Sequence, residues 1–277
     1  MTGARSIAEQ ALPYCKPSGN GWLRGPCPFC EMEGHRDRKA SFGVSPSGIY
    51  SCFRCGRKGK VDVPADLQQA APTGERAPMG PPEGFEPIWE RDAWEAECYA
   101  EARAYLAKRG VGRALAREVG IGAVLSGRYH HRVVAPVLGD EGVWLGWVGR
   151  TWGKSDRPYI YPEGEWRATS MFNHACLRVE TDEPALVVEG FFDALAYWPD
   201  SAAVLGKPSE WQVDALVESR RPVAVVLDGD AWREGWSLGE LLRFRGQRAG
   251  SVRLDAGLDP DEVDRGWLRE EARRCLG

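Results

Sequence analysis

The chain has 277 residues, 43% apolar content and a net charge of −4, enough for a sizeable core in about two or three small domains. No apolar run approaches the roughly 20 residues of a membrane span, and Met1 to Gln10 lacks the apolar centre of a signal peptide. We therefore expect a cytoplasmic protein without a membrane partner, whose eight cysteines stay reduced and available to metals.

The charge is unevenly distributed along the chain. Residues 1–63 carry ten Lys/Arg against five Asp/Glu, a net charge of +5, whereas the remaining residues carry 26 against 35, a net charge of −9. A basic segment favours contact with phosphates, and an acidic body suits the binding of cations.

The basic segment contains two C-x2-C pairs. Cys27 and Cys30 form the first pair, and Cys52 and Cys55 form the second after 21 intervening residues. Each pair can sit on a tight turn that offers two thiolates to one tetrahedral zinc. His35 could replace one ligand, but its spacing fits less well, so the sequence favours one structural zinc held by four cysteines.

A linker and a mixed region follow. Residues 64–87 are rich in Pro, Ala, Gly and Gln without periodicity, which predicts a flexible linker. Apolar and aromatic residues at three- and four-residue steps predict an amphipathic helix over 89–109, with Gly110 at its end. The stretch 132–152 then alternates as a strand, a turn and a strand.

The last third of the chain alternates short apolar runs with helical patterns. We expect strands at 185–188, 202–205 and 223–227, and helices at 191–198, 209–219 and from about Gly235 onward. This alternation predicts a parallel sheet and an α/β fold. Trp232 or Trp236 is expected to line a site at this sheet.

Acidic residues gather where these strands end. They are Glu189 and Asp193, then Asp228 and Asp230, then Asp259, Asp261 and Glu262. Ligand sites in parallel sheets lie at the carboxyl ends of the strands, and clustered like charges are costly unless cations neutralise them. Oxygen-only ligands favour Mg²⁺ or Mn²⁺. The alternative for each acid is a solvated loop or a helix cap.

Several of these segments resemble known families. "VVEGFFDAL", "VVLDGD" and "GLDPDEV" resemble the three acidic motifs of the Toprim domain. "RGPCPFC" and "KASFGVSPSGIYSCFRCGRKG" resemble the zinc-binding domain of bacterial and phage primases, and "YLAKRGVGRALAREVGIG" resembles the opening of their RNA polymerase domain. The four-cysteine set looks phage-like, because cellular versions commonly use Cys-His-Cys-Cys.

The resemblance implies a domain order. It places a small zinc-ribbon domain for template recognition at 1–63, the linker at 64–87, a mixed N-terminal catalytic subdomain at 88–183 and a Toprim parallel-sheet subdomain at 184–277. The fold is then α/β, or α+β for the whole chain.

The resemblance also implies an activity, that of a DNA-dependent RNA primase which makes short primers on single-stranded DNA with two or more Mg²⁺ or Mn²⁺ ions. Asp228, Asp230 and Asp259 would bind metal with Asp261 close by. Glu189 would be the general base or a water-mediated ligand, and Asp193 would bind metal or orient Glu189. The implied partners are template DNA, ribonucleoside triphosphates and a separate replicative helicase, in a bacterial or phage-infected cell.

Template and nucleotide contacts are implied for basic and aromatic positions. In the body, Arg150 matches a family position, and Lys154 or Arg157 would supply the second cation. In the zinc domain, the residues expected on or near the sheet are Lys39, Ser41, Phe42, Tyr50, Arg54 and Lys58. Aromatic faces stack on bases and cations neutralise phosphates, but Phe42 and Tyr50 could equally pack in a small core around the zinc.

Two other classes compete with the primase reading. Recombination mediators join a four-cysteine zinc site to a Toprim domain without polymerase activity, but more than a hundred residues separate Cys55 from Glu189 here. Topoisomerases and Toprim nucleases need a tyrosine-bearing cleavage region or an ATPase, for which this chain has no room.

Overall fold

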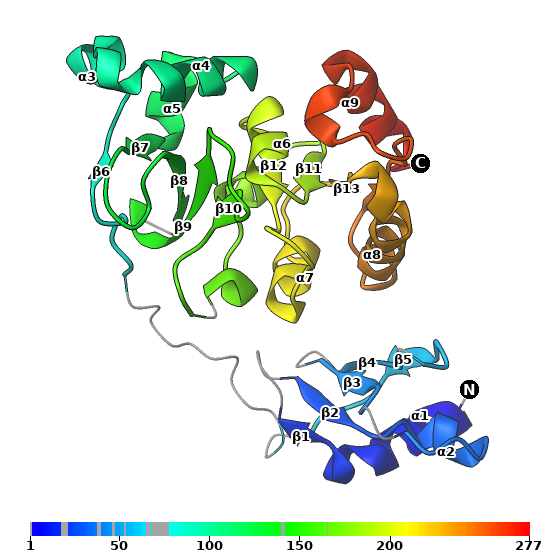
Figure 1. Cartoon of the computed structure of the whole chain (residues 1–277). Coiled ribbons are helices and arrows are strands. Elements are labelled where there is room, and N and C mark those ends of the chain that lie inside the picture. Colours follow the sequence, from blue (N-terminus) through cyan, green and yellow to red (C-terminus); the bar gives the residue numbers. More distant parts are fainter. Residues whose placement is uncertain are drawn as a thin grey trace. The chain divides into compact units, whose positions relative to one another are not determined.

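The computed structural model describes residues 2–17, 22–37, 40–45, 48–52, 54–64, 67, 78–139, 142–164 and 166–277, with side chains from residue 5 onward. Two compact units make up the chain, Met1–Glu75 and Arg76–Gly277. Both are drawn in Figure 1. Within the described ranges, no helix is long and apolar enough to span a membrane.

The first unit is a small antiparallel sheet packed on helices. Strands β1 (Lys16–Pro17), β2 (Leu23–Gly25), β3 (Phe42–Val44), β4 (Ile49–Cys52) and β5 (Lys58–Lys60) pair in chain order. Helix α1 (Thr2–Ala11), a 3-10 turn (Leu12–Tyr14) and helix α2 (Pro28–Met32) complete the unit. In β4, Tyr50 and Cys52 are buried while Ile49 and Ser51 are half-buried, so alternate side chains face the core.

The second unit begins with a five-stranded antiparallel sheet in the order β10-β9-β8-β7-β6. Its strands are β6 (Phe85–Glu86), β7 (Gly122–Val124), β8 (Arg132–Leu138), β9 (Trp144–Thr151) and β10 (Tyr159–Ile160). The β8–β9 pairing confirms the predicted strand, turn and strand. Because β6 pairs with β7, the expected linker ends earlier than residue 87; residues 65–66 and 68–77 of that linker lie outside the described part of the chain.

The single helix predicted over 89–109 is wrong. The structure has α3 (Arg91–Glu95), a 3-10 turn (Glu97–Tyr99) and α4 (Ala100–Lys108), followed by α5 (Arg113–Val119). The interruption is at Ala96, whose backbone is extended (φ −63°, ψ 136°) and whose carbonyl accepts a hydrogen bond from Arg103 Nη1 at 2.5 Å. Gly110 has φ 72° just after α4, the left-handed conformation that ends helices at glycine.

The rest of the second unit contains a four-stranded sheet of parallel pairs in the order β12-β11-β13-β14. The strands are β11 (Ala185–Val188), β12 (Ser201–Ala203), β13 (Val223–Val225) and β14 (Ala249–Ser251). The helices are α6 (Phe191–Ala196), α7 (Glu210–Val217), α8 (Trp232–Phe244) and α9 (Arg265–Arg274), with 3-10 turns at Trp166–Thr169, His174–Arg178, Gly229–Ala231 and Pro260–Glu262. The predicted parallel sheet is confirmed, and β14 was not foreseen.

Helix α8 begins earlier than expected. The prediction placed its start near Gly235, whereas it starts at Trp232, directly after the 3-10 turn Gly229–Ala231. That turn already carries the chain into helical conformation, because Trp232 has φ −58° and ψ −31°. As a result the indole of Trp232 is held on the first turn of α8.

Two apolar cores cover the two faces of the parallel sheet. Residues 185, 187, 223 and 225 pack with α7 and α8, and residues 186, 188, 224 and 226 pack with α6 and α9. Figure 1 shows α7 and α8 on one side of this sheet and α9 on the other. The second of these cores also contains Val133 and Val148 of the antiparallel sheet, so one continuous core joins both sheets of the second unit.

Candidate active site and zinc centre

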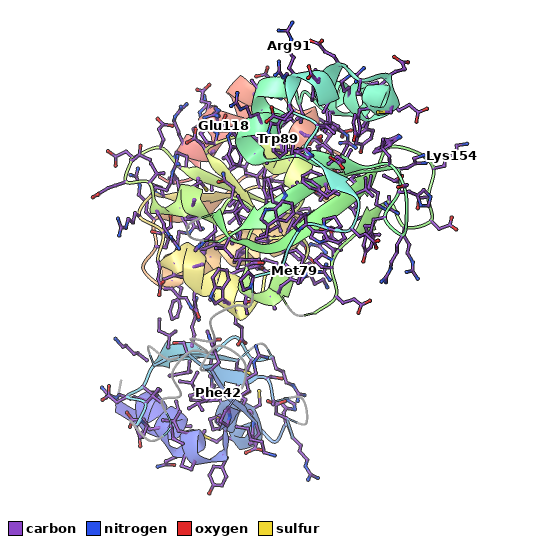
Figure 2. The ribbon with its side chains drawn as sticks, turned by 90° about the vertical axis from the view of Figure 1, so that its left-hand side faces the viewer. Phe42, Met79, Trp89, Arg91, Glu118 and Lys154 are labelled. Atoms are coloured by element: carbon purple, nitrogen blue, oxygen red, sulfur yellow. The ribbon has the colours of Figure 1, made fainter. Side chains whose placement is uncertain are left out.

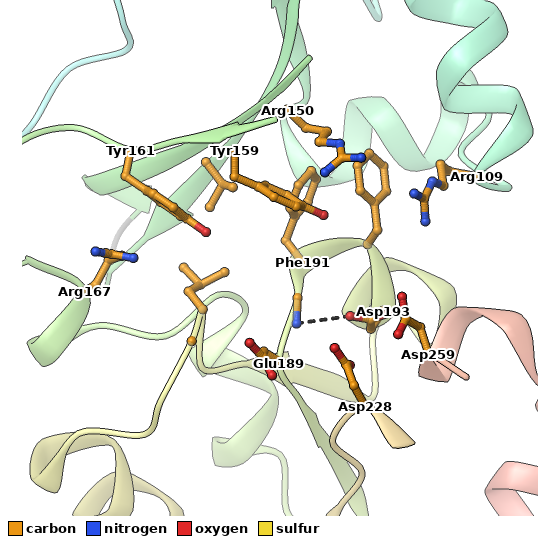
Figure 3. Close-up of a pocket in the computed structure, with 15 residues that line it drawn as sticks. Arg109, Arg150, Tyr159, Tyr161, Arg167, Glu189, Phe191, Asp193, Asp228 and Asp259 are labelled. Atoms are coloured by element: carbon orange, nitrogen blue, oxygen red, sulfur yellow. Dashed lines mark hydrogen bonds between the residues drawn. The ribbon is translucent and has the colours of Figure 1, made fainter. Parts of the chain in front are cut away.

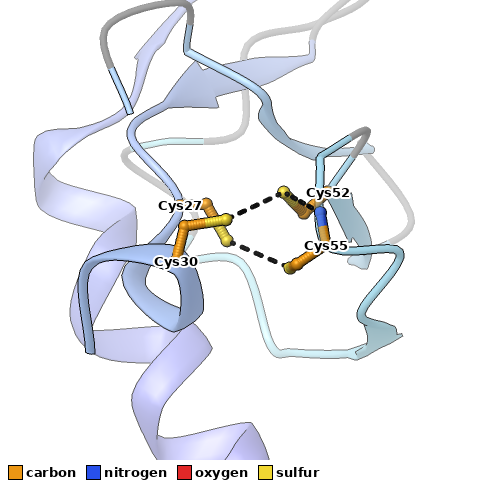
Figure 4. A group of neighbouring side chains, drawn as sticks. All are labelled: Cys27, Cys30, Cys52 and Cys55. Carbon is orange, nitrogen blue, oxygen red and sulfur yellow. Dashed lines mark hydrogen bonds between the residues drawn. The ribbon is translucent and has the colours of Figure 1, made fainter. Parts of the chain in front are cut away.

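The four cysteines of the first unit meet around one point, as Figure 4 shows. The Sγ atoms of Cys27 and Cys55 are 3.8 Å apart, as are those of Cys30 and Cys52. Tetrahedral zinc with Zn–S bonds of about 2.3 Å requires S–S separations of about 3.8 Å. The geometry therefore fits one zinc, and this is a zinc-binding site. His35 is exposed and lies outside the cluster.

Backbone groups and one buried carboxylate shape the two cysteine turns. Cys52 Sγ accepts hydrogen bonds from the Arg54 and Cys55 amides at 3.4 and 3.5 Å. Asp37, 8% exposed, accepts from the Cys27 amide at 3.0 Å and the Ser41 amide at 2.8 Å. Sequence reasoning missed Asp37, because it stands among several charged residues in a polar loop and no motif or spacing distinguishes it from them.

The expected template contacts of the first unit separate into two groups. Phe42 is 0% exposed and Tyr50 is 3% exposed, and their ring centroids lie 5.5 Å apart beside Phe29. Figure 2 shows Phe42 within this unit. Phe42 is therefore a core residue and cannot stack on a base, which corrects its assignment as a template contact. Arg54 and Lys58 are exposed, and Lys39 lies outside the described residues.

The acidic site of the second unit is at the carboxyl edge of the parallel sheet. Glu189 directly follows β11, and Asp228 lies three residues beyond β13. Asp193 is in the first turn of α6, and Asp259 immediately precedes the 3-10 turn Pro260–Glu262. All four line one pocket of about 360 Å³, drawn in Figure 3. The sheet thus brings together acids from three separate stretches of sequence.

Electrostatics in this pocket disfavour charged carboxylates. Burial, and then the charges of the neighbouring aspartates, raise the pKa of Asp193 to about 8. The same two causes raise the pKa of Asp228 to about 6, and burial, Glu262 and Asp261 raise the pKa of Asp259. Negative charge has therefore accumulated beyond what the surrounding protein neutralises.

Asp230 and Asp261, two of the three other predicted acids, lie outside the pocket lining. Asp261 forms an ion pair with Arg109 at 2.8 Å, and its side chain is 11% exposed. Asp230 is exposed, and neither residue lines the pocket. Oδ1 of Asp228 and Oδ1 of Asp261 are buried without a hydrogen-bond partner. Buried acceptors of this kind are rare unless a water or an ion satisfies them.

Arginines and tyrosines form the opposite wall. Arg150 Nε donates to Tyr105 Oη at 3.0 Å, and its guanidinium lies 4.4 Å from the centre of the Tyr159 ring. Arg109 and Arg167 also line the pocket. Of the predicted cations, Arg150 is at the site, whereas Lys154 and Arg157 are exposed on the β9–β10 loop outside the lining, as Figure 2 shows for Lys154.

Sequence reasoning missed Arg109 and Arg167 as pocket residues. Arg109 follows α4 and reaches the site across the fold, and Arg167 stacks on Tyr161 with its guanidinium 4.3 Å from the ring centre. Neither residue has a sequence neighbour that marks a site. Trp232 and Trp236, expected to line the site, are not among the lining residues.

Two contacts position the acidic turns. Tyr197, fully buried at the end of α6, donates through its hydroxyl to the Pro260 carbonyl at 2.8 Å. Gly229 donates through its amide to the Leu258 carbonyl at 2.9 Å, and a Cβ at Gly229 would lie 1.9 Å from the Asp255 carbonyl oxygen. Only glycine can therefore separate Asp228 from Asp230 without moving the neighbouring loop.

Comparison with known proteins adds independent findings. No family model matches the chain. It is 25% identical over 318 residues to a DNA primase of Aquifex aeolicus, covering 90% of this chain and 62% of the relative. It superposes on the zinc-binding and RNA polymerase domains of Aquifex aeolicus primase with a TM-score of 0.55 at 23% identity, covering 98% of this chain and 82% of that structure.

This chain has the DnaG primase fold. A DnaG primase catalytic domain bound to single-stranded DNA is also similar, with a TM-score of 0.54 at 20% identity over 67% of this chain and 78% of that one. The predicted α/β class with a zinc-binding domain is confirmed. The chain spans 43% and 62% of two curated primases that it matches.

Proposed function

We propose that this chain is a DNA-dependent RNA primase that synthesises short RNA primers on single-stranded DNA. The observation that carries the proposal is the pocket in which Glu189, Asp193, Asp228 and Asp259 face Arg109, Arg150 and Arg167. Nucleotidyl transfer requires carboxylates that bind divalent cations and cationic side chains that bind the phosphates. This pocket places the two kinds of group on opposite walls. Similarity to DNA primases and to the DnaG fold supports the same activity.

The donor set fits Mg²⁺ or Mn²⁺. All donors are carboxylate oxygens, and the unpaired Oδ1 atoms of Asp228 and Asp261 supply acceptors that a cation would satisfy. Asp228, Asp230 and Asp259 would hold two or more ions, with Glu189 and Asp261 as further ligands. When bound, such ions would activate the 3′-hydroxyl, align the α-phosphate and neutralise the leaving pyrophosphate.

The protein groups supply orientation and proton transfer. Arg150 is fixed by Tyr105 and Tyr159, so its charge is already aimed into the pocket before a triphosphate arrives. Glu189 would accept the proton of the attacking hydroxyl. Asp193 accepts the Gly190 amide at 3.1 Å, which holds the turn directly after Glu189 in place.

The zinc module would select the start site on the template, using Arg54, Lys58 and Lys39 as phosphate contacts. We assign it to residues 1–63, joined by a linker that starts at residue 64 and ends before β6 to a mixed subdomain that runs to residue 183 and a Toprim subdomain at 184–277. The substrates would be ribonucleoside triphosphates, the partners template DNA and a separate replicative helicase, and the setting the cytoplasm of a bacterial or phage-infected cell.

The proposal is tested by incubating the purified chain with single-stranded DNA, labelled ribonucleotides and Mg²⁺ or Mn²⁺. Wild type should make new oligonucleotides, and Asp228→Asn should reduce synthesis by roughly a hundredfold or more. Asp156→Asn, at an exposed acid on the β9–β10 loop, is the matched control and should keep full activity.

Two results would contradict the proposal. Wild-type rates in Asp228→Asn across a metal titration would remove Asp228 from the metal site. Tight binding of single-stranded DNA by wild type, without synthesis under any metal, would favour the alternative of a non-catalytic zinc and Toprim recombination mediator.

A further inference from the structure

An aromatic and cationic patch lies beside the carboxyl edge of the parallel sheet. Its centre is Trp232, two residues after Asp230 on the first turn of α8. The guanidinium of Arg253, just beyond β14, lies 4.5 Å from the centre of the Trp232 ring, and that of Arg233 lies 5.2 Å from it. One indole ring therefore makes cation–π contacts with two guanidinium groups.

The patch extends over exposed apolar surface. Trp236, one helical turn after Trp232, is 55% exposed, and Leu258, directly before Asp259, is 37% exposed. An exposed Trp beside another Trp costs solvation free energy, and such surface commonly marks a binding site. Trp232 follows Asp230 by two residues and Leu258 precedes Asp259, so the patch is next to the acidic edge in the chain.

The charges of the patch favour an anion as its ligand. Arg233 and Arg253 form none of the ion pairs found within the described residues, although Glu234 directly follows Arg233 and Asp255 lies two residues after Arg253. Most other arginines of this part of the chain do pair, as Arg221 does with Asp200 at 3.0 Å. Two exposed guanidinium groups stacked on an aromatic ring suit a chain of phosphates and bases.

We propose that Trp232, Arg233, Arg253 and Trp236 form a stacking platform for unpaired bases of single-stranded nucleic acid beside the acidic edge. The inference rests on the proposed function, which makes single-stranded DNA the molecule handled at this edge. It adds a second contact surface made of residues that do not line the pocket. Stacking needs no base-specific hydrogen bonds, so the platform accepts any sequence.

The test is photo-crosslinking of the full chain to single-stranded DNA that carries 5-iodouracil, followed by mass mapping of the crosslinked peptides. No nucleotides are added, so synthesis does not intervene. Wild type should give a crosslink in the peptide that contains Trp232 or Trp236. Trp232→Ala should lose it and bind DNA roughly fivefold or more weakly, as loss of one stacked base predicts. Trp232→Phe should retain most of both signals, because it keeps an aromatic face.

Two further variants separate stacking from structure. Trp267→Ala, at a 44% exposed Trp on α9, is the matched control and should crosslink and bind as wild type does. Arg253→Ala should make the slope of log affinity against log salt concentration shallower by about 0.7. This is the change expected when one phosphate contact to a single strand is lost.

The outcomes distinguish this inference from the function on which it rests. If wild type synthesises primers but Trp232→Ala crosslinks and binds like Trp267→Ala, the platform is wrong and the primase proposal stands. If wild type neither binds single-stranded DNA nor synthesises primers, both proposals fail together. A crosslink lost in Trp232→Ala and kept in Trp232→Phe supports the platform.

Discussion

Individual carboxylates set the pH response of the acidic pocket. In the folded protein the pKa of Asp193 is about 8 and that of Asp228 about 6, against an ordinary value of 3.8. Metal binding requires the deprotonated forms. We therefore expect Mn²⁺ affinity to rise as pH increases from about 5 to 8, with protons released on binding. Calorimetry in two buffers of different ionisation enthalpy measures that release, and binding independent of pH would contradict the assignment.

The same shifts predict how the metal-free protein responds to pH. Raised carboxyl pKa values mean that the folded state holds more protons than the unfolded state between about pH 4 and 8. This contribution to stability is fully present below pH 4 and is lost as pH rises through 6 and then 8. Thermal melts without metal should show the decline, and saturating Mn²⁺ should reverse most of it.

At the residue scale the sequence predicted groups that share a motif and missed those that do not. The four cysteines and the strand-end acids stand at spacings that follow from zinc turns and from strand periodicity. Arg109 reaches Asp261, a residue 152 positions away, and only tertiary structure brings them together. Phe42 is aromatic, as residues that stack on bases are, but its side chain is fully buried and therefore packs in the core.

At the scale of elements, the zinc turns hold the small first unit together. Its core, which includes Phe29, Phe42 and the cysteines, is small, so we expect zinc to supply much of the folding free energy. Cys52→Ser should unfold this unit, lower zinc content from one per chain to near zero and leave the second unit folded. Cys98→Ser, at an exposed cysteine outside the cluster, should retain zinc. Metal analysis and limited proteolysis read out both variants.

The turn that carries Asp259 and Asp261 depends on Tyr197. Tyr197→Phe removes the hydrogen bond to the Pro260 carbonyl and should cost about 1 kcal/mol of unfolding free energy. It should also weaken Mn²⁺ binding in the absence of substrate, because the turn loses its fixed distance from α6. Tyr14→Phe, at a 75% exposed tyrosine, is the control for both measurements. Unchanged Mn²⁺ affinity would show that other contacts fix the turn.

Element types were more predictable than element ends. Runs such as 185–188 read correctly as strands because both faces of the sheet are buried. The prediction of one helix over 89–109 was wrong because periodicity indicates which side chains are buried. It does not indicate whether the helical backbone is continuous between them. A change of direction at Ala96 keeps Tyr99 and Leu106 in the core.

At the scale of the whole molecule, the two units predict a division of labour. Deleting residues 1–63 should reduce initiation on bare template roughly a hundredfold, because the tethered module no longer concentrates template at the active site. Extension of a short RNA primer already annealed to DNA should persist, since a duplex replaces the module in holding the template. Rates of the two reactions in the truncated and full chains give the comparison. Equal loss of both would mean that the module completes the active site itself.

The continuous core of the second unit limits how this protein can be divided for expression. Val133 and Val148 of the antiparallel sheet share one core with Leu186, Val188 and Phe191 on the other side of residue 183. Fragments 76–183 and 184–277 should therefore each aggregate when produced alone, because each exposes half of that core. Co-production should recover a soluble pair. The second unit is in this respect one cooperative folding unit, which can be transferred to another protein as a whole but not as halves.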